Sequence, residues 1–237
     1  MEKDHKKEVA MKRTAREQAT HKTRMMLLRE AAEMFLQNGY SATTIKALSL
    51  KTGLPSGSIT NLFANKEELV CQLIGIVVDY EYKITESILT EVTDDPLLRY
   101  AFAATLQLNM AETSEHMREM YWVTYSLDRC SALIHDMLTV KLEETFRDYL
   151  PTLERKDFYE REIATAGIIR GFMAERCDLY FTMERKVRAF LETNLLIYRV
   201  PDEKIAEAID FVLSYDMKSI GEGAVSGMLS YMAEHLQ

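Results

Sequence analysis

The segment that decides the fold is "TGLPSGSITNLFANKEEL", Thr52 to Leu69. Gly53 permits a backbone turn that other residues resist, and Pro55 prevents one continuous helix through that turn. The next helix can run only from about residue 55 to residue 63, because Asn65 caps another helix directly after it. Short helices joined by a tight turn and followed by a long helix are typical of a helix-turn-helix.

An amphipathic helix precedes the turn, and a second short helix leads into it. The first extends from about residue 23 to Gly39, which ends it as a C′ residue. The second begins with Thr43 or Thr44 as its N-cap and stops at Gly53. Apolar side chains at helical spacing form one small core: Leu27, Ala31, Met34, Phe35, Ile45, Leu48, Ile59, Leu62 and Phe63. This packing leaves the small polar side chains of the third helix facing outward.

The rest of the chain has the composition of helices. A long helix is expected from residue 65 to about 92, and others near 95–112, 114–127, 130–149, 156–181, 184–199 and 202–217. The glycines between 221 and 227 leave the last segment undecided. No sustained alternation of β-branched residues occurs, so the sequence predicts an all-α protein. Its parts are a basic flexible arm or frayed helix (1–22), the helix-turn-helix unit (23–66) and a larger helical part (67–237).

Charge is divided unevenly along the chain. The net charge is −8, but residues 1–66 hold twelve Lys and Arg against six Asp and Glu, a net of +6, and the remainder carries −14. Because exposed charges act over a Debye length, ~8 Å at physiological salt, a polyanion would meet the local positive excess. A helix face with only small polar groups beside this charge is suited to the DNA major groove.

The stretch "AAEMFLQNGYSATTIKALSLKTGLPSGSITNLFANKEEL", residues 31–69, resembles the N-terminal signature of the TetR family of transcriptional regulators. The residues that agree in type and spacing are Gly39, Thr43, Thr44, Ile45, Gly53, Gly57, Phe63, Lys66, Glu67 and Leu69. Pro55 stands where the family has a capping serine, and Thr60 where a tyrosine commonly touches the DNA backbone. Ser49 and Thr52 are more polar than the usual alanines. The resemblance implies a dimeric DNA-binding regulator, most often a repressor that a ligand releases from a palindromic operator.

Candidate DNA contacts follow from the chemistry of this region and from the resemblance. Thr44 and Lys66 lie at helix N-termini, where free N–H groups favour phosphate, and Lys46 is one turn from the recognition helix. The candidate base readers are Ser56, Ser58, Thr60 and Asn61. Asn61 is suited to bidentate pairing with adenine, which is worth about 1–3 kcal/mol of discrimination. Three basic residues of the arm either add salt-dependent affinity for DNA or only keep the arm soluble: Lys12, Arg13 and Arg16.

By the resemblance, residues 67–237 form a ligand-binding and dimerisation domain. The small residues Gly167, Gly171 and Ala174 fall on one helix face and let another helix approach closely, either within the subunit or, as the resemblance favours, across a homodimer interface. Aromatic and methionine side chains predict a soft interior for a largely apolar small-molecule effector. The candidate ligand contacts are Trp122 and Tyr125, with Asn109, Arg129 and His135 as polar anchors.

Catalytic motifs are missing from the sequence. It contains no HExxH, GxSxG, P-loop or dinucleotide fingerprint, so we expect no enzyme activity and no cofactor. Cys71, Cys130 and Cys177 lie about fifty residues apart without a CxxC pair, which argues against a disulfide framework or a metal site. Two alternatives stay open: a helical protein-interaction module with a degenerate DNA-binding end, and an unrecognised enzyme in the C-terminal helices.

The longest apolar run also bears on location. It covers only Leu73 to Val78, against the roughly 18–20 residues that span a bilayer. We therefore expect a cytoplasmic protein without a membrane partner.

Overall fold

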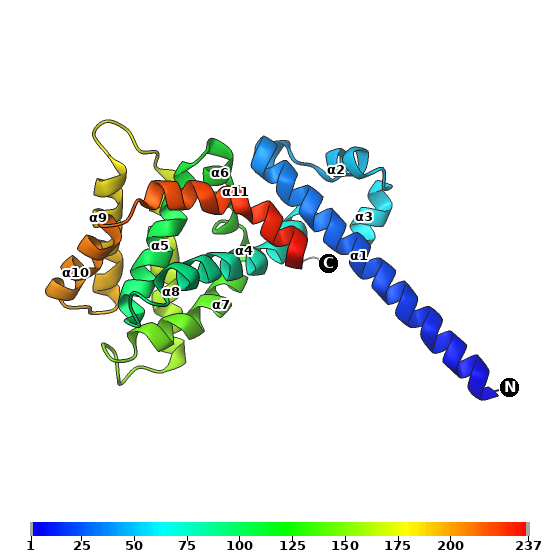
Figure 1. Ribbon diagram of the computed structural model, residues 1–237, viewed down its shortest axis with the longest axis horizontal. Helices are drawn as coiled ribbons and strands as arrows, with labels where there is room; N and C mark the ends of the chain where they lie inside the picture. The colour runs from blue at the N-terminus through cyan, green and yellow to red at the C-terminus, as the bar shows by residue number, and fades with distance from the viewer. Residues whose placement is uncertain (1, 236–237) are drawn as a thin grey trace.

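The computed structural model describes residues 2–235 (Figure 1), and across them all regular secondary structure is helical, as predicted. The helices are α1 (Glu2–Ala42), α2 (Ile45–Thr52), α3 (Ser56–Leu62), α4 (Lys66–Leu89), α5 (Pro96–Glu112), α6 (Glu115–Thr124), α7 (Asp128–Phe146), α8 (Arg155–Ala174), α9 (Met183–Ile197), α10 (Asp202–Leu213) and α11 (Met217–His235). None of these helices is both long and apolar enough to cross a membrane.

The helix-turn-helix unit contains the helices that the sequence predicts. The regular part of α1 is interrupted at Gly39, whose φ of 78° and ψ of 172° suit glycine alone. Gly53 ends α2 in the left-handed conformation, with φ of 72°. Ile59 and Phe63 are 0% exposed and belong to the same apolar core as the stripe of α1. Asn65 caps α4 by accepting a hydrogen bond from the Glu68 N–H at 2.9 Å.

The predicted arm is helical in its backbone. Helix α1 begins at Glu2 and continues without a break into the predicted first helix (Figure 1). The side chains of Lys12, Arg13 and Arg16 lie outside the described residues. The flexibility of residues 1–22 therefore stays a prediction.

Helix α5 lies at the centre of the larger helical part. It packs against α4, α6, α7, α8, α9, α10 and α11, and α4 connects this bundle to the helix-turn-helix unit (Figure 1). Helix α6 packs against α1 on the other side. One continuous apolar core joins the two parts of the chain.

The extent of α8 differs from the prediction. The expected helix over 156–181 ends at Ala174, and an irregular segment precedes α9. The carboxylate of Asp178 accepts hydrogen bonds from the N–H groups of Tyr180 and Phe181 at 2.7 and 2.6 Å. This local turn competes with the helix, because an Asp side chain offers backbone N–H groups another acceptor.

The glycine-rich last segment is the helix α11. Gly221 lies against α5, where an added Cβ would come within 3.0 Å of the Asn109 Cβ. The glycine thus permits close approach of two helices, and the sequence could not separate this use from a loop.

Candidate nucleic-acid interface and interior cavity

The outer face of α3 carries all four predicted base readers. Ser56, Ser58, Thr60 and Asn61 are exposed, whereas Ile59 between them is fully buried. The Thr60 hydroxyl donates to the Gly57 carbonyl at 3.2 Å. Because apolar packing fixes one side of α3, the other side presents short polar groups on a rigid support.

Two residues that depart from the family pattern stabilise the turn before α3. The Ser49 hydroxyl donates to the Leu54 carbonyl at 2.6 Å, and the Thr52 hydroxyl donates to the Leu48 carbonyl at 2.8 Å. Pro55 precedes α3 without a side-chain cap. Alanine side chains could not donate hydrogen bonds to these two carbonyls. Serine at position 49 and threonine at position 52 are therefore compatible with the turn.

The predicted phosphate contacts differ in their surroundings. Thr44 is exposed and caps α2, accepting a hydrogen bond from the Ala47 N–H at 3.0 Å, and Lys46 is exposed two residues later. Lys66 is half-buried: its ammonium donates to the Tyr40 carbonyl at 3.0 Å and lies 3.7 Å from the centre of the Tyr40 ring. Burial lowers the pKa of Lys66. Lys66 thus secures the end of α1, a role that the sequence pattern did not indicate.

A carboxylate on α6 joins the helix-turn-helix unit to the larger part. Glu119 accepts hydrogen bonds from the Tyr40 N–H at 2.8 Å, the Ser41 N–H at 3.1 Å and the Ser41 hydroxyl at 2.5 Å. Burial would raise the pKa of Glu119, but these hydrogen bonds and the nearby His116 outweigh it and lower the pKa. The turn around Gly39 is therefore bound to α6 by a charged acceptor.

An interior cavity of about 90 Å³ lies between α1, α4, α6 and α11. Its walls are mainly aliphatic and methionine side chains, including Met117, Met120, Met228 and Met232. One carboxyl group faces this apolar space: Glu81, which is 2% exposed. The cavity therefore combines an adaptable lining with a single buried acid.

Glu81 has two hydrogen-bond donors. The Tyr121 hydroxyl donates to its Oε1 and the Gln107 amide to its Oε2, both at 2.5 Å. Burial raises the pKa of Glu81 to about 7, and these hydrogen bonds offset only part of the rise. A carboxyl with a pKa near neutral pH can either donate or accept a hydrogen bond, depending on whether it holds a proton.

A second cavity of about 50 Å³ adjoins the first and shares Glu81, Gln107 and Tyr125 with it. It contains another buried acid, Glu162, whose pKa burial raises to about 8 against an opposing hydrogen bond from Thr165. His135 Nδ1 lies 3.3 Å from Glu162 Oε1, and burial lowers the pKa of His135. The opposite directions of the two shifts mean that at neutral pH the contact is a hydrogen bond between uncharged groups.

Of the predicted ligand contacts, Tyr125 alone lines these cavities. Trp122 is 48% exposed, and Arg129 forms a surface ion pair with Glu68 at 2.6 Å. Asn109 is buried between α5 and α11 and donates to the Thr105 carbonyl at 2.8 Å. The structure thus does not bring the predicted anchors together.

Glu81 was not predicted from the sequence, whereas Tyr121, Met117 and Met120 belong to the aromatic and methionine side chains expected in the interior. The signal was present: Glu81 continues the buried stripe of α4 at i+3 from Val78 and i+7 from Ile74. A carboxylate in an apolar stripe is a stronger indication of a site than an aromatic pair is.

The predicted interface residues lie on one outward face of α8. Gly167, Gly171 and Ala174 are exposed, and a Cβ added at either glycine would meet no atom within 4 Å. Two large apolar side chains are also exposed on this pair of packed helices: Ile163 on α8 is 49% exposed, and Leu196 on α9 is 57% exposed. Among the described residues, no helix of the subunit packs against the two glycines of this stripe.

Comparisons with known proteins agree with the geometry of the N-terminal part. Residues 27–73 match the family model described as "Bacterial regulatory proteins, tetR family". Two relatives are the HTH-type transcriptional repressor KstR2 of Mycobacterium tuberculosis strain CDC 1551 / Oshkosh and that of strain ATCC 25618 / H37Rv. Each is 37% identical over 73 residues, which cover 31% of this chain and 36% of the relative.

The chain thus spans about a third of the length of those curated relatives. The family match runs from within α1, through α2 and α3, to the first part of α4. It contains the buried residues Ile59 and Phe63 and the exposed face of α3. Over residues 27–73, the chain therefore matches the bacterial regulatory proteins of the tetR family, and this part has the helix-turn-helix geometry described above.

Proposed function

We propose that this protein is a homodimeric repressor that binds a palindromic operator and releases it when a largely apolar small molecule enters the interior cavity. The observation that carries the proposal is the polar outer face of α3, fixed from behind by the buried Ile59 and Phe63. Such a helix reads base edges in the major groove, because its short side chains let the backbone approach closely.

Within this face, Asn61 is the main candidate for base recognition. Its amide presents a donor and an acceptor together, the pair that adenine requires in the major groove. Thr44 and Lys46 are exposed on α2 and supply backbone contacts that set the orientation of α3. Lys66 contributes indirectly by supporting the end of α1.

The exposed stripe of α8 supports the dimer. Gly167 and Gly171 leave room for a helix of a second subunit, and Ile163 and Leu196 would be buried around it. A dimer explains the palindromic operator, since two symmetric recognition helices read two half-sites about one helical turn apart.

The cavity supports an effector with one polar group. Its present volume of about 90 Å³ is below the roughly 300–1,000 Å³ of typical ligand sites, so binding requires the methionine-rich walls to move. Glu81 offers the hydrogen-bonding partner inside that apolar space. A nearly complete switch requires an effector preference of about 5.5 kcal/mol for the released form.

The experiment begins with the DNA that the purified protein retains from fragmented genomic DNA of its source. Gel shifts then compare the retained site with random duplex for the wild type, Asn61→Ala and the control Ser87→Ala, an exposed change on α4. We expect Asn61→Ala to weaken the retained site by about 1–3 kcal/mol and random DNA little. Equal loss on both duplexes would exclude Asn61 as a base reader.

The effector is tested on the same complex. The genes beside the retained site encode proteins whose small-molecule substrates are the first compounds to test. These compounds are added to the wild type and to Glu81→Leu. We expect one of them to lower operator affinity in the wild type and to do so less in the variant. Binding of a molecule in the cavity without any change in operator affinity would exclude the release mechanism.

A further inference from the structure

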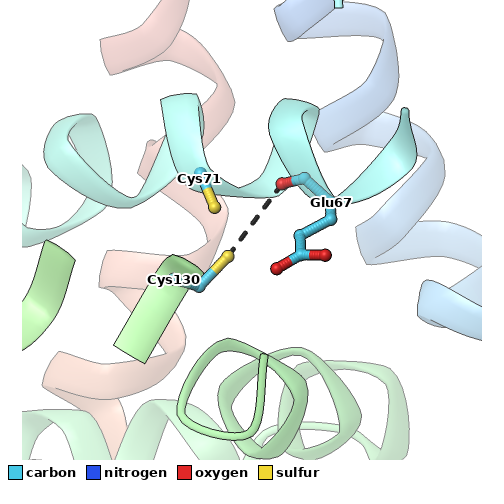
Figure 2. Close-up of side chains that lie close together, drawn as sticks. All are labelled: Glu67, Cys71 and Cys130. Carbon is cyan, nitrogen blue, oxygen red and sulfur yellow. Dashed lines mark hydrogen bonds between the residues drawn. The ribbon is translucent and has the colours of Figure 1, made fainter. Parts of the chain in front are cut away.

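Three metal-ligating side chains meet where α4 and α7 begin (Figure 2). Glu67 and Cys71 lie one turn apart on α4, and Cys130 lies in the first turn of α7. One carboxylate oxygen and the two Sγ atoms all lie within 4.8 Å of one another. Residues that are about sixty positions apart in the sequence thus form a compact S₂O donor set.

The surroundings hold these donors in place. The Glu67 carboxylate accepts a hydrogen bond from the Arg129 N–H at 3.4 Å, which directs it toward the start of α7. The Cys130 thiol lies 3.9 Å from the Glu67 carbonyl, as the dashed line in Figure 2 marks. Both cysteines are buried, while Glu67 is half-buried and gives solvent a route to the cluster.

We propose that Glu67, Cys71 and Cys130 bind one zinc-class divalent ion per subunit, with a water molecule at the fourth position. Two thiolates and a carboxylate match the ligands of Zn²⁺, and its tetrahedral bond lengths separate neighbouring ligand atoms by about 3.5 Å. The ligand atoms, which lie within 4.8 Å of one another, would have to move closer together to hold such an ion. The third cysteine, Cys177, lies beyond α8 and is not part of the cluster.

Burial raises the pKa of both the Cys71 and the Cys130 thiol, so neither is a thiolate at neutral pH and neither has the character of a redox-sensing cysteine. On binding, Zn²⁺ would displace both thiol protons, and its two positive charges would offset two of the three negative charges of the ligands in the buried space.

The position of the site gives the ion a regulatory consequence, which rests on the proposed DNA-binding function. Helix α4 starts at Lys66, four residues after the end of α3 at Leu62. An ion shared by α4 and α7 fixes the first turn of α4 to the larger domain, and with it the placement of α3. Metal binding is therefore expected to change operator affinity.

The direct test uses Co²⁺ as a spectroscopic substitute for Zn²⁺ on the reduced full-length protein. We expect a thiolate-to-cobalt charge-transfer band that saturates at one equivalent and that Zn²⁺ abolishes. Cys71→Ser and Cys130→Ser should lose this band, and Glu67→Gln should bind Zn²⁺ at least 10- to 100-fold more weakly, the loss typical for outer-shell changes. The control Cys177→Ser should match the wild type.

A second measurement needs no variant. Zn²⁺ should protect Cys71 and Cys130, but not Cys177, from alkylation, as read by peptide mass spectrometry. The absence of a saturable cobalt band, or equal protection of all three cysteines, would overturn the proposal. An ion that binds Glu67→Gln as tightly as the wild type would also overturn it, because a two-coordinate Cu⁺ site on the cysteines alone would behave in this way. Because these measurements contain no DNA, they succeed or fail independently of the operator experiment.

Discussion

Replacing Glu81 by Gln should change how the stability of this protein depends on pH. Glu81 is 2% exposed in the cavity wall, and burial raises its pKa from 4.5 to about 7. The folded state therefore holds a proton that the unfolded state releases between these two values. The stabilisation from this proton is complete below pH 4.5 and is lost as the pH rises through about 7.

The magnitude follows from the size of the shift. Each pKa unit corresponds to about 1.4 kcal/mol, so the Glu81 carboxyl alone should lower the free energy of unfolding by roughly 3 kcal/mol between pH 4.5 and pH 8. Glutamine has a similar shape and stays uncharged, and it can still accept the hydrogen bond from Tyr121. Glu81→Gln should therefore remove that part of the slope and be more stable than the wild type at pH 8.

The assay is urea denaturation at a fixed protein concentration, followed by circular dichroism at several pH values from 5 to 8. Glu91→Gln, an exposed substitution just after α4, is the matched control and should keep the wild-type slope. If Glu81→Gln and the wild type lose stability equally between pH 5 and pH 8, the carboxyl does not carry a raised pKa and the reasoning about the cavity is wrong.

Three further substitutions test the packing. Phe63→Ala removes a ring that is 0% exposed and should cost about 3–5 kcal/mol in urea denaturation; a loss below about 1 kcal/mol would contradict its burial. Gly39→Ala should cost about 1–3 kcal/mol because its φ of 78° suits glycine, whereas Gly57→Ala, within α3, should not destabilise. Gly167→Leu should weaken a dimer in sedimentation experiments, and an effect equal to that of the exposed Gly223→Leu would contradict the interface.

Local rules were sufficient for the helix-turn-helix unit. Gly39, Gly53 and Asn65 each end or begin a helix by a mechanism that acts within a few residues, so their roles could be inferred without tertiary information. The burial of Ile59 and Phe63 followed from helical spacing in the same way. The exposed face of α3 is the side of the helix that does not pack against this core.

The cavity and the cysteine cluster depend on contacts between distant helices. Glu81 meets Gln107 and Tyr121 from α5 and α6, and Cys71 meets Cys130 from α7, so no local pattern specifies either group. Aromatic spacing on α6 indicated Trp122, but the side that faces the interior carries Tyr121. A helical stripe defines which residues share a face, and only packing decides which face is buried.

The ten-residue α6 has a consequence for the way the two parts of the chain communicate. Tyr121 and Met117 form part of the cavity wall, while Glu119 binds the chain at Tyr40 and Ser41 just before α2. A helix of fewer than three turns is about 15 Å long and moves as a rigid rod. A guest molecule that displaces its inner side must either carry the start of α2 along or break the bonds to Glu119. In the proposed mechanism, the cavity and the start of α2 would thus be separated by the diameter of one helix, about 10 Å.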